Sequence, residues 1–198
     1  MQAAEYFDSI AQFWDMEYSD NELARAITAA ISVPRGGGYV LDIGCGSGGM
    51  ILDLMRHGAC EIEGIDFSNA MAEMARDKFS FDPRVRIETI DFFALEHSGY
   101  DLAVAFNTYQ YFRYPGAFIA KAHSLLREDG RLTVACGFSR KRTNALSETL
   151  PKGIARPLKS AAEEAKDWAP YFKIDCICDT DDLYLISGRS AAGIGGKL

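Results

Sequence analysis

Four glycines lie within six residues at positions 44–49 (G-C-G-S-G-G), directly after the apolar stretch 39–43. A helical pattern begins at once, because Met50, Ile51 and Leu54 are spaced to share one face. A glycine-rich turn between a buried strand and a helix lets backbone N–H groups come close to a ligand, since no Cβ stands in the way. The spacing therefore predicts a strand, a tight turn and a helix that bind a nucleotide-like ligand.

Asp42, two residues before the first glycine, narrows the choice of ligand. Gly44, Gly46 and Gly49 satisfy the G-x-G-x-x-G pattern of dinucleotide sites. A carboxylate at the carboxyl end of the strand would repel a pyrophosphate, whereas it would attract an amino group and a sulfonium. We therefore expect S-adenosylmethionine, with S-adenosylhomocysteine as its product, in preference to a dinucleotide.

The stretch V-L-D-I-G-C-G-S-G-G at 40–49 resembles the first motif of the class I S-adenosylmethionine-dependent methyltransferases. The resemblance continues in order through 64–71, 90–92, 100–107 and 125–134. It implies an α/β, Rossmann-like fold with a seven-stranded, mostly parallel sheet in the order 3-2-1-4-5-7-6. In that fold the last strand is antiparallel, helices cover both faces, and an N-terminal helical lid folds over the cofactor.

Three acidic strand ends carry the predicted cofactor site. Asp66 ends the second strand, where a carboxylate accepts hydrogen bonds from ribose hydroxyls of either cofactor type. The alternative is that Asp66 only caps the next helix or is simply exposed to solvent. Asp91 matches the position that, by resemblance, bonds the adenine amino group, with Phe92 offering its backbone and ring edge. The predicted cofactor-binding residues are Asp42, Gly44, Cys45, Gly46, Asp66, Phe67, Met71, Asp91, Phe92 and Asn107. For Met71, packing in the core is the competing interpretation.

Residues 107–111 follow the fourth strand and should lie between cofactor and acceptor. The sequence N-T-Y-Q replaces the N-P-P-Y type of signature that DNA and protein amide methylases carry, which disfavours methylation of a planar amino group. Asn107 and Tyr109 are the candidates for catalytic residues, although no convincing general base is present. Tyr109 and Tyr111 could face a sulfonium through cation–π attraction, or could equally be core residues.

The pattern of residues 3–31 predicts two helices. Pro34 and the glycines at 36–38 separate them from the first strand of the sheet. We expect Tyr6 and Trp14 on the first helix to contact the substrate as part of the lid; the alternative is that they only pack on the sheet. The chain is expected to be one domain, with a helical cap at 1–35, a Rossmann-like core at 36–189 and a flexible tail at 190–198.

The stretch 137–159 shows no strong periodicity and is predicted to be a long loop. It holds six basic residues against the single acid Glu148. An anionic acceptor that contacts Arg140 is one interpretation, and a solvated basic surface is the other. Beyond it the sequence predicts a helix at 160–168 and a hairpin about Thr180, whose short turn requires antiparallel strands.

Composition excludes several classes of function. The formal net charge of −7 argues against a nucleic acid partner. No apolar run approaches the roughly 20 residues that span a bilayer, so we expect no membrane partner and a cytoplasmic protein. Five cysteines do not suggest a disulfide framework, and Cys176 and Cys178 lack further ligands nearby, so no metal site is expected.

The sequence thus favours methyl transfer to a small-molecule acceptor by in-line displacement, in which the protein aligns the reactants and excludes water. Three alternatives stay open: a protein that binds the cofactor without transferring methyl, as a sensor or partner subunit; an RNA or protein methyltransferase; and a nicotinamide oxidoreductase.

Overall fold

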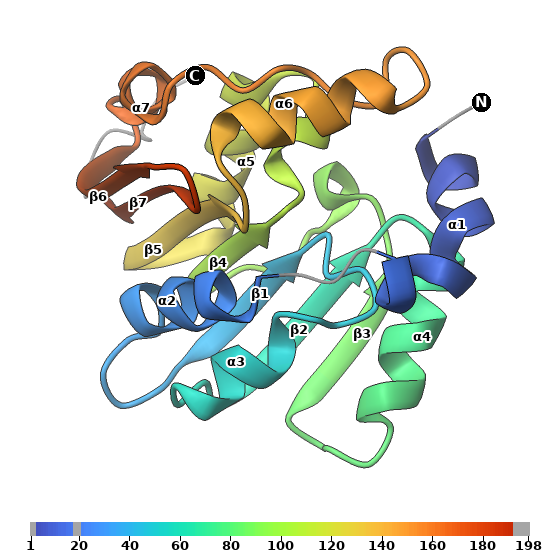
Figure 1. Ribbon diagram of the computed structural model, residues 1–198. Helices are drawn as coiled ribbons and strands as arrows, with labels where there is room; N and C mark the ends of the chain where they lie inside the picture. Colours follow the sequence, from blue (N-terminus) through green and yellow to red (C-terminus); the bar gives the residue numbers. More distant parts are fainter. Residues whose placement is uncertain (1–2, 18–20, 192–198) are drawn as a thin grey trace.

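A computed structural model describes residues 3–17 and 21–191 as a seven-stranded sheet with helices on both faces (Figure 1). The strand order is β3-β2-β1-β4-β5-β7-β6, and β7 runs antiparallel to both of its neighbours, β5 and β6, while the other neighbouring pairs are parallel. The strands are β1 (Tyr39–Ile43), β2 (Glu61–Asp66), β3 (Val85–Thr89), β4 (Tyr100–Phe106), β5 (Leu126–Cys136), β6 (Phe172–Asp179) and β7 (Tyr184–Ser190). The predicted sheet order and the antiparallel last strand are confirmed.

The α-helices are α1 (Ala3–Glu17), α2 (Glu22–Ser32), α3 (Ile51–Arg56), α4 (Asn69–Phe79), α5 (Pro115–Leu125), α6 (Arg140–Thr149) and α7 (Ala161–Trp168). Two single-turn 3-10 helices, η1 (Phe92–Ala94) and η2 (Tyr109–Tyr111), follow β3 and β4. Sequence signals set several helix starts: the side chains of Asn21 and Ser68 accept hydrogen bonds from Ala24 N and Met71 N.

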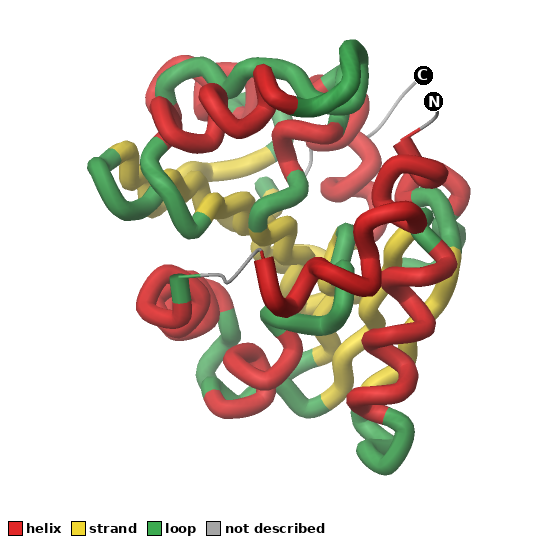
Figure 2. The backbone as a smooth tube through the Cα atoms, turned by 45° about the vertical axis from the view of Figure 1, so that its right-hand side comes forward, coloured by secondary structure: helices red, strands yellow, loops and turns green. Residues whose placement is uncertain are grey.

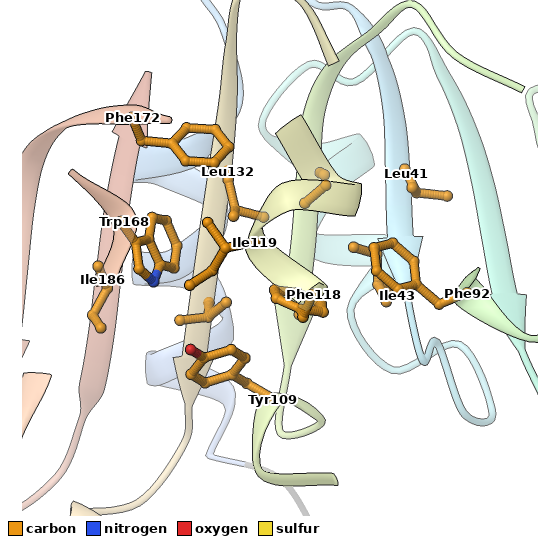
Figure 3. Close-up of a cluster of buried hydrophobic side chains, with 14 of the residues drawn as sticks. Leu41, Ile43, Phe92, Tyr109, Phe118, Ile119, Leu132, Trp168, Phe172 and Ile186 are labelled. Carbon is orange, nitrogen blue, oxygen red and sulfur yellow. The ribbon is translucent and has the colours of Figure 1, made fainter. Parts of the chain in front are cut away.

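The core forms two layers because the central strands are buried on both faces. β4 is buried at every position, as its sequence, apolar except for Asp101, predicts for an inner parallel strand. On one face Leu41 and Ile43 pack with residues of α5 and α7, including Phe118 and Trp168 (Figure 3). On the other face Val40 and Leu102 pack with residues of α2 and α3.

The helix α1 lies apart from both layers. It packs against α4, and Figure 2 shows it crossing in front of the strands. The two predicted N-terminal helices are therefore present. Within the described ranges, no helix combines the length and the apolar character that a membrane span requires.

Three predictions about elements need correction. Residues 140–149 form the helix α6, capped by Ser139, instead of a loop. The helical period was hidden because α6 is largely exposed and buries only Thr143. The turn residues Asp129 and Gly130 predict a fifth strand from Arg131 to Cys136, whereas β5 begins at Leu126 and pairs irregularly with β4 between Tyr100 and Leu102. Of the predicted tail, Ser190 belongs to β7, and residues 192–198 lie outside the described residues.

Candidate functional site

The carboxyl ends of β1, β2 and β4 meet at the glycine turn, where two cavities open. The first has a volume of about 600 Å³ and the second about 440 Å³. The walls of both cavities share five residues: Gly44, Asp66, Phe67, Thr108 and Tyr111. The two cavities are therefore neighbours, and three of the residues between them, Gly44, Asp66 and Phe67, are predicted cofactor residues.

The backbone of the glycine turn requires glycine. Gly44, Gly46 and Gly48 have φ angles of 65°, 54° and 84°, in the left-handed region that favours residues without a Cβ. A Cβ on Gly44 would overlap the hydroxyl of Thr108. The turn thus brings backbone into the cavity at a point where a side chain does not fit.

Asp42 lies at the base of the first cavity as a buried carboxylate. It is 1% exposed, and within residues 3–17 and 21–191 its Oδ2 has no hydrogen-bond partner. Burial, together with the nearby charge of Asp66, raises the pKa of Asp42 to about 7. A buried oxygen with no partner is costly unless a ligand satisfies it. The position therefore suits a cationic group.

Asp66 is anchored by backbone donors. Gly46 N donates to its Oδ2 at 2.9 Å and Ser68 N donates to its Oδ1 at 2.8 Å. Burial raises its pKa, and these N–H groups act in the opposite direction. The carboxylate thus ties the glycine turn to the start of α4. The cap of that helix is Ser68, so Asp66 does not cap it directly, and at 8% exposed Asp66 is not a solvent-exposed residue either. Each oxygen keeps further acceptor capacity toward the two cavities that Asp66 lines.

Asp91 and Phe92 have different surroundings in the structure. Asp91 lines the second cavity, and its Oδ1 accepts a hydrogen bond from Phe93 N at 2.7 Å, which caps η1. Phe92 also borders this cavity, but its ring is 4% exposed and packs against Phe112 and Phe118. Phe92 is therefore mainly a core residue that closes one wall.

The helix α1 contributes aromatic rings to the site. Phe7 and Trp14 line the first cavity, and a Cβ on Gly46 would lie 3.8 Å from Trp14 Nε1. The Phe7 ring is buried and makes edge contacts with Tyr6, Trp14, Phe67 and Tyr111, with centroids 5.0 to 6.0 Å apart. Tyr6 joins this cluster but lines neither cavity, so its predicted substrate contact is not supported.

The structure also corrects the predictions for Tyr109 and Arg140. Tyr109 is fully buried in the core (Figure 3), and its hydroxyl donates to Glu164 Oε2 at 3.0 Å. Burial raises the pKa of Tyr109, so it stays a neutral phenol. Arg140 pairs with Asp179 at 3.1 Å on the surface. Neither residue lines a cavity, whereas Tyr111 lines both.

Asn107 lies in the wall of the first cavity with a φ of 55°. Its side-chain oxygen accepts a hydrogen bond from Gly137 N at 2.8 Å, and its carbonyl accepts one from Gln110 Nε2 at 2.8 Å. These bonds link the ends of β4 and β5. Cys45 and Met71 are buried beside the same cavity, as the core alternative for Met71 anticipates, and burial raises the pKa of the Cys45 thiol.

Six polar or charged residues that line the first cavity were not among the predicted site residues: Asp15, Glu22, Arg25, Ser47, Lys78 and Thr108. Arg25 carried a usable signal, since it is the only basic residue in the first 34. Ser47 and Thr108 adjoin predicted site residues. Lys78 carried none, because its place depends on where α1 packs against α4. Across the described part of the chain, no group of three or more potential ligand side chains could hold a metal ion.

Comparisons with known proteins agree on the fold. The structure is similar to a chain of the complex between the Haloferax volcanii Trm112 methyltransferase activator and a putative methyltransferase, with a TM-score of 0.84 and 17% identity over 97% of this chain and 99% of that chain. It is similar to the [4+2]-cyclase SpnF, with a TM-score of 0.80 and 17% identity over 97% of this chain and 96% of that one.

A third similar structure is the N-methyltransferase NodS from Bradyrhizobium japonicum WM9 in complex with S-adenosylhomocysteine, with a TM-score of 0.74 and 15% identity over 96% of this chain and 99% of that one. By sequence, no curated protein matches. A family model described as a methyltransferase domain matches residues 41–132, the segment that holds the glycine turn, Asp42, Asp66 and Asp91. Residues 41–132 thus match the methyltransferase-domain family, in agreement with the resemblance to S-adenosylmethionine-dependent methyltransferases that the sequence motifs carry.

Proposed function

We propose that this protein binds S-adenosylmethionine across the two cavities and transfers its methyl group to a small-molecule acceptor. The observation that carries the proposal is Asp42. Asp42 lines the first cavity, and its buried Oδ2 has no hydrogen-bond partner among the described residues, so a cationic amino group would satisfy it and a phosphate would be repelled.

The wall residues fit this cofactor in order. Asp42 would hold the amino group, and Arg25, whose Nε donates to Asp53 at 2.8 Å, is a cation in the same cavity that would attract the carboxylate. Asp66, between the cavities, would accept from the ribose. Asp91 and the backbone of Phe92, in the second cavity, would border the adenine.

For this reaction the protein must align the reactants and exclude water from the site. When bound, the cofactor supplies a methyl group on a sulfonium, which is an excellent leaving group. Phe7, Trp14 and Tyr111 line the cavity and would exclude water, and aromatic faces attract a sulfonium. Tyr109 takes no part, because its hydroxyl is committed to Glu164 inside the core.

Two features favour a small acceptor over a nucleic acid. The chain is acidic overall, with a formal net charge of −7. Within the basic stretch, Arg140 pairs with Asp179, Arg156 with Glu164 and Lys159 with Asp167. Three of the six basic residues of this stretch are therefore paired with acidic side chains of the protein.

Calorimetry on dialysed protein tests the proposal. We expect S-adenosylmethionine and S-adenosylhomocysteine to bind and NAD to give no heat. Asp42→Asn should weaken S-adenosylhomocysteine about tenfold or more, the scale of a lost hydrogen bond to a charged group. Glu61→Gln, an equal charge change on an exposed residue at the opposite end of β2, is the control and should bind normally.

A second experiment addresses the acceptor. The protein is incubated with methyl-labelled cofactor and a metabolite extract, and the labelled product is identified. Label in a low-molecular-weight compound is expected. Label only in RNA or protein, or binding without any turnover, would reject the small-molecule assignment.

A further inference from the structure

Arg156 lies on the segment between α6 and α7, and its side chain is only 16% exposed. Its Nη1 donates to Glu164 Oε1 at 2.6 Å, and its Nε donates to the Phe112 carbonyl at 3.0 Å. Its backbone N donates to the Gln110 carbonyl at 2.9 Å, and its guanidinium carbon lies 4.7 Å from the centre of the Tyr109 ring. One arginine thus contacts three residues of the loop that follows β4.

Glu164 completes this arrangement from α7. Its side chain is fully buried, and it accepts hydrogen bonds from Tyr109 Oη at 3.0 Å and Lys159 N at 3.2 Å in addition to Arg156. A buried ion pair whose partners are hydrogen-bonded on several sides is weak evidence for stability but strongly fixes geometry. The ion pair therefore holds Tyr109 through contacts with its hydroxyl and its ring, and neither Arg156 nor Glu164 lines a cavity.

The loop 107–112, which Arg156 contacts, forms part of the walls of both cavities. Asn107, Thr108 and Tyr111 line the first cavity, and Thr108, Tyr111 and Phe112 line the second. The segment that carries Arg156 also contacts α1, because Ile154, 4% exposed, packs in the cluster that contains Phe7. The position of the wall beside the proposed methyl group thus depends on residues outside the cavities.

We propose that Arg156 is a positioning residue, which with Glu164 holds the loop 107–112 in the geometry that binds the cofactor. This rests on the proposed function, since the ligand is the S-adenosyl cofactor. Arg156 lines neither cavity, so its effect would pass through the loop.

The test compares Arg156→Lys, Arg156→Ala and Arg140→Met by calorimetry with S-adenosylhomocysteine. Lysine keeps the charge but cannot donate to Glu164 and to the Phe112 carbonyl in the fork geometry of a guanidinium. We expect Arg156→Lys to weaken binding about tenfold. Arg140→Met, which removes a surface-paired guanidinium from the same basic stretch, should change it less than about twofold.

Chemical rescue separates positioning from a general loss of stability. Methylguanidinium added to Arg156→Ala should restore affinity, whereas methylammonium at the same concentration should not. Thermal unfolding of each variant shows whether it is folded at the temperature used; if Arg156→Ala is not, Arg156→Lys decides the matter.

The failure of this inference differs from that of the proposed function. If the wild-type protein binds no S-adenosyl ligand, the proposed function fails and this inference with it. If the wild-type protein binds and both Arg156 variants bind equally well, or if methylammonium restores as much as methylguanidinium, the positioning role alone is overturned.

Discussion

At the scale of single residues, the main feature of the candidate site is the carboxyl group of Asp42, whose burial makes its ionised form costly. Asp42 is buried beside Asp66, and burial raises its pKa to about 7. A folded-state pKa above the unfolded value means that ionisation of Asp42 destabilises the free protein as pH rises through about 7. A bound cation would reverse this cost, which couples ligand affinity to pH.

The first prediction concerns that coupling. Because the amino group would favour ionised Asp42, binding below pH 7 must release a proton, and S-adenosylhomocysteine affinity should rise with pH up to about 7 and then level off. Between pH 5 and 6 the slope should approach about tenfold per pH unit. Calorimetry across this range measures it. Asp42→Asn should give a flat profile, and an equally steep slope in that variant would exclude Asp42 as the group responsible.

The second prediction concerns the glycine turn. Gly44→Ala should abolish measurable cofactor binding, because the new Cβ overlaps Thr108 and the residue has a φ of 65°. Gly58→Ala is the matched control: its φ is 102°, yet a Cβ there meets nothing within 4 Å. Both variants should lose about 1 kcal/mol or more of stability from backbone strain. Normal affinity in Gly44→Ala would show that the turn does not approach the ligand.

At the scale of elements, α1 is attached to the glycine turn and to α4 by two carboxylates. Asp8 Oδ1 accepts from Ser68 Oγ at 2.6 Å and from Ala70 N at 3.1 Å, at the start of α4. Asp15 accepts from Ser47 Oγ at 2.6 Å and pairs with Lys78 at 2.6 Å. Asp15 thus joins α1 to the glycine turn and to α4, and Asp8 joins α1 to the start of α4. Trp14, on the same helix, lines the first cavity.

The third prediction follows from this attachment. Asp15→Ala should increase the open population of α1 roughly fivefold, a modest factor because the Asp15 side chain is 45% exposed. Hydrogen exchange of the amides in residues 3–17 measures the opening. Gln12→Ala, an exposed substitution on the same helix, should leave exchange unchanged. Unaltered exchange in Asp15→Ala would mean that the aromatic cluster alone holds α1 down.

At the scale of the whole molecule, the proposed ligand would touch the ends of several strands and α1 at once. A ligand that binds only the folded state stabilises it by about 2.7 kcal/mol at a hundredfold excess over its Kd. For a chain of this size that corresponds to a rise in Tm of roughly 5 to 10 °C.

The fourth prediction is therefore a ligand-dependent Tm. S-adenosylhomocysteine should raise the Tm of the wild-type protein by that amount, and NAD at the same concentration should leave it unchanged. Asp42→Asn should show a smaller rise at the same ligand concentration. A shift with NAD that equals the shift with S-adenosylhomocysteine would contradict the cofactor assignment.

The sheet order was predicted from the resemblance to a known family, whereas the sequence by itself determined the glycine turn and the acidic strand ends. These features are local: an apolar run, glycines at fixed spacing and a carboxylate at a strand end are read from consecutive residues. Asp42, Asp66 and Asp91 accordingly lie where the motifs predict, around two adjoining cavities.

Only the tertiary structure decided which side chains after β4 reach the cavities. The positive φ of Asn107 and the following 3-10 turn rotate Tyr109 into the core and Tyr111 toward the site, and two tyrosines spaced two apart do not reveal that rotation. The ion pairs that draw Arg140 and Arg156 away from the cavities join residues on different elements. Such pairings depend on how elements pack in space, which no local pattern encodes.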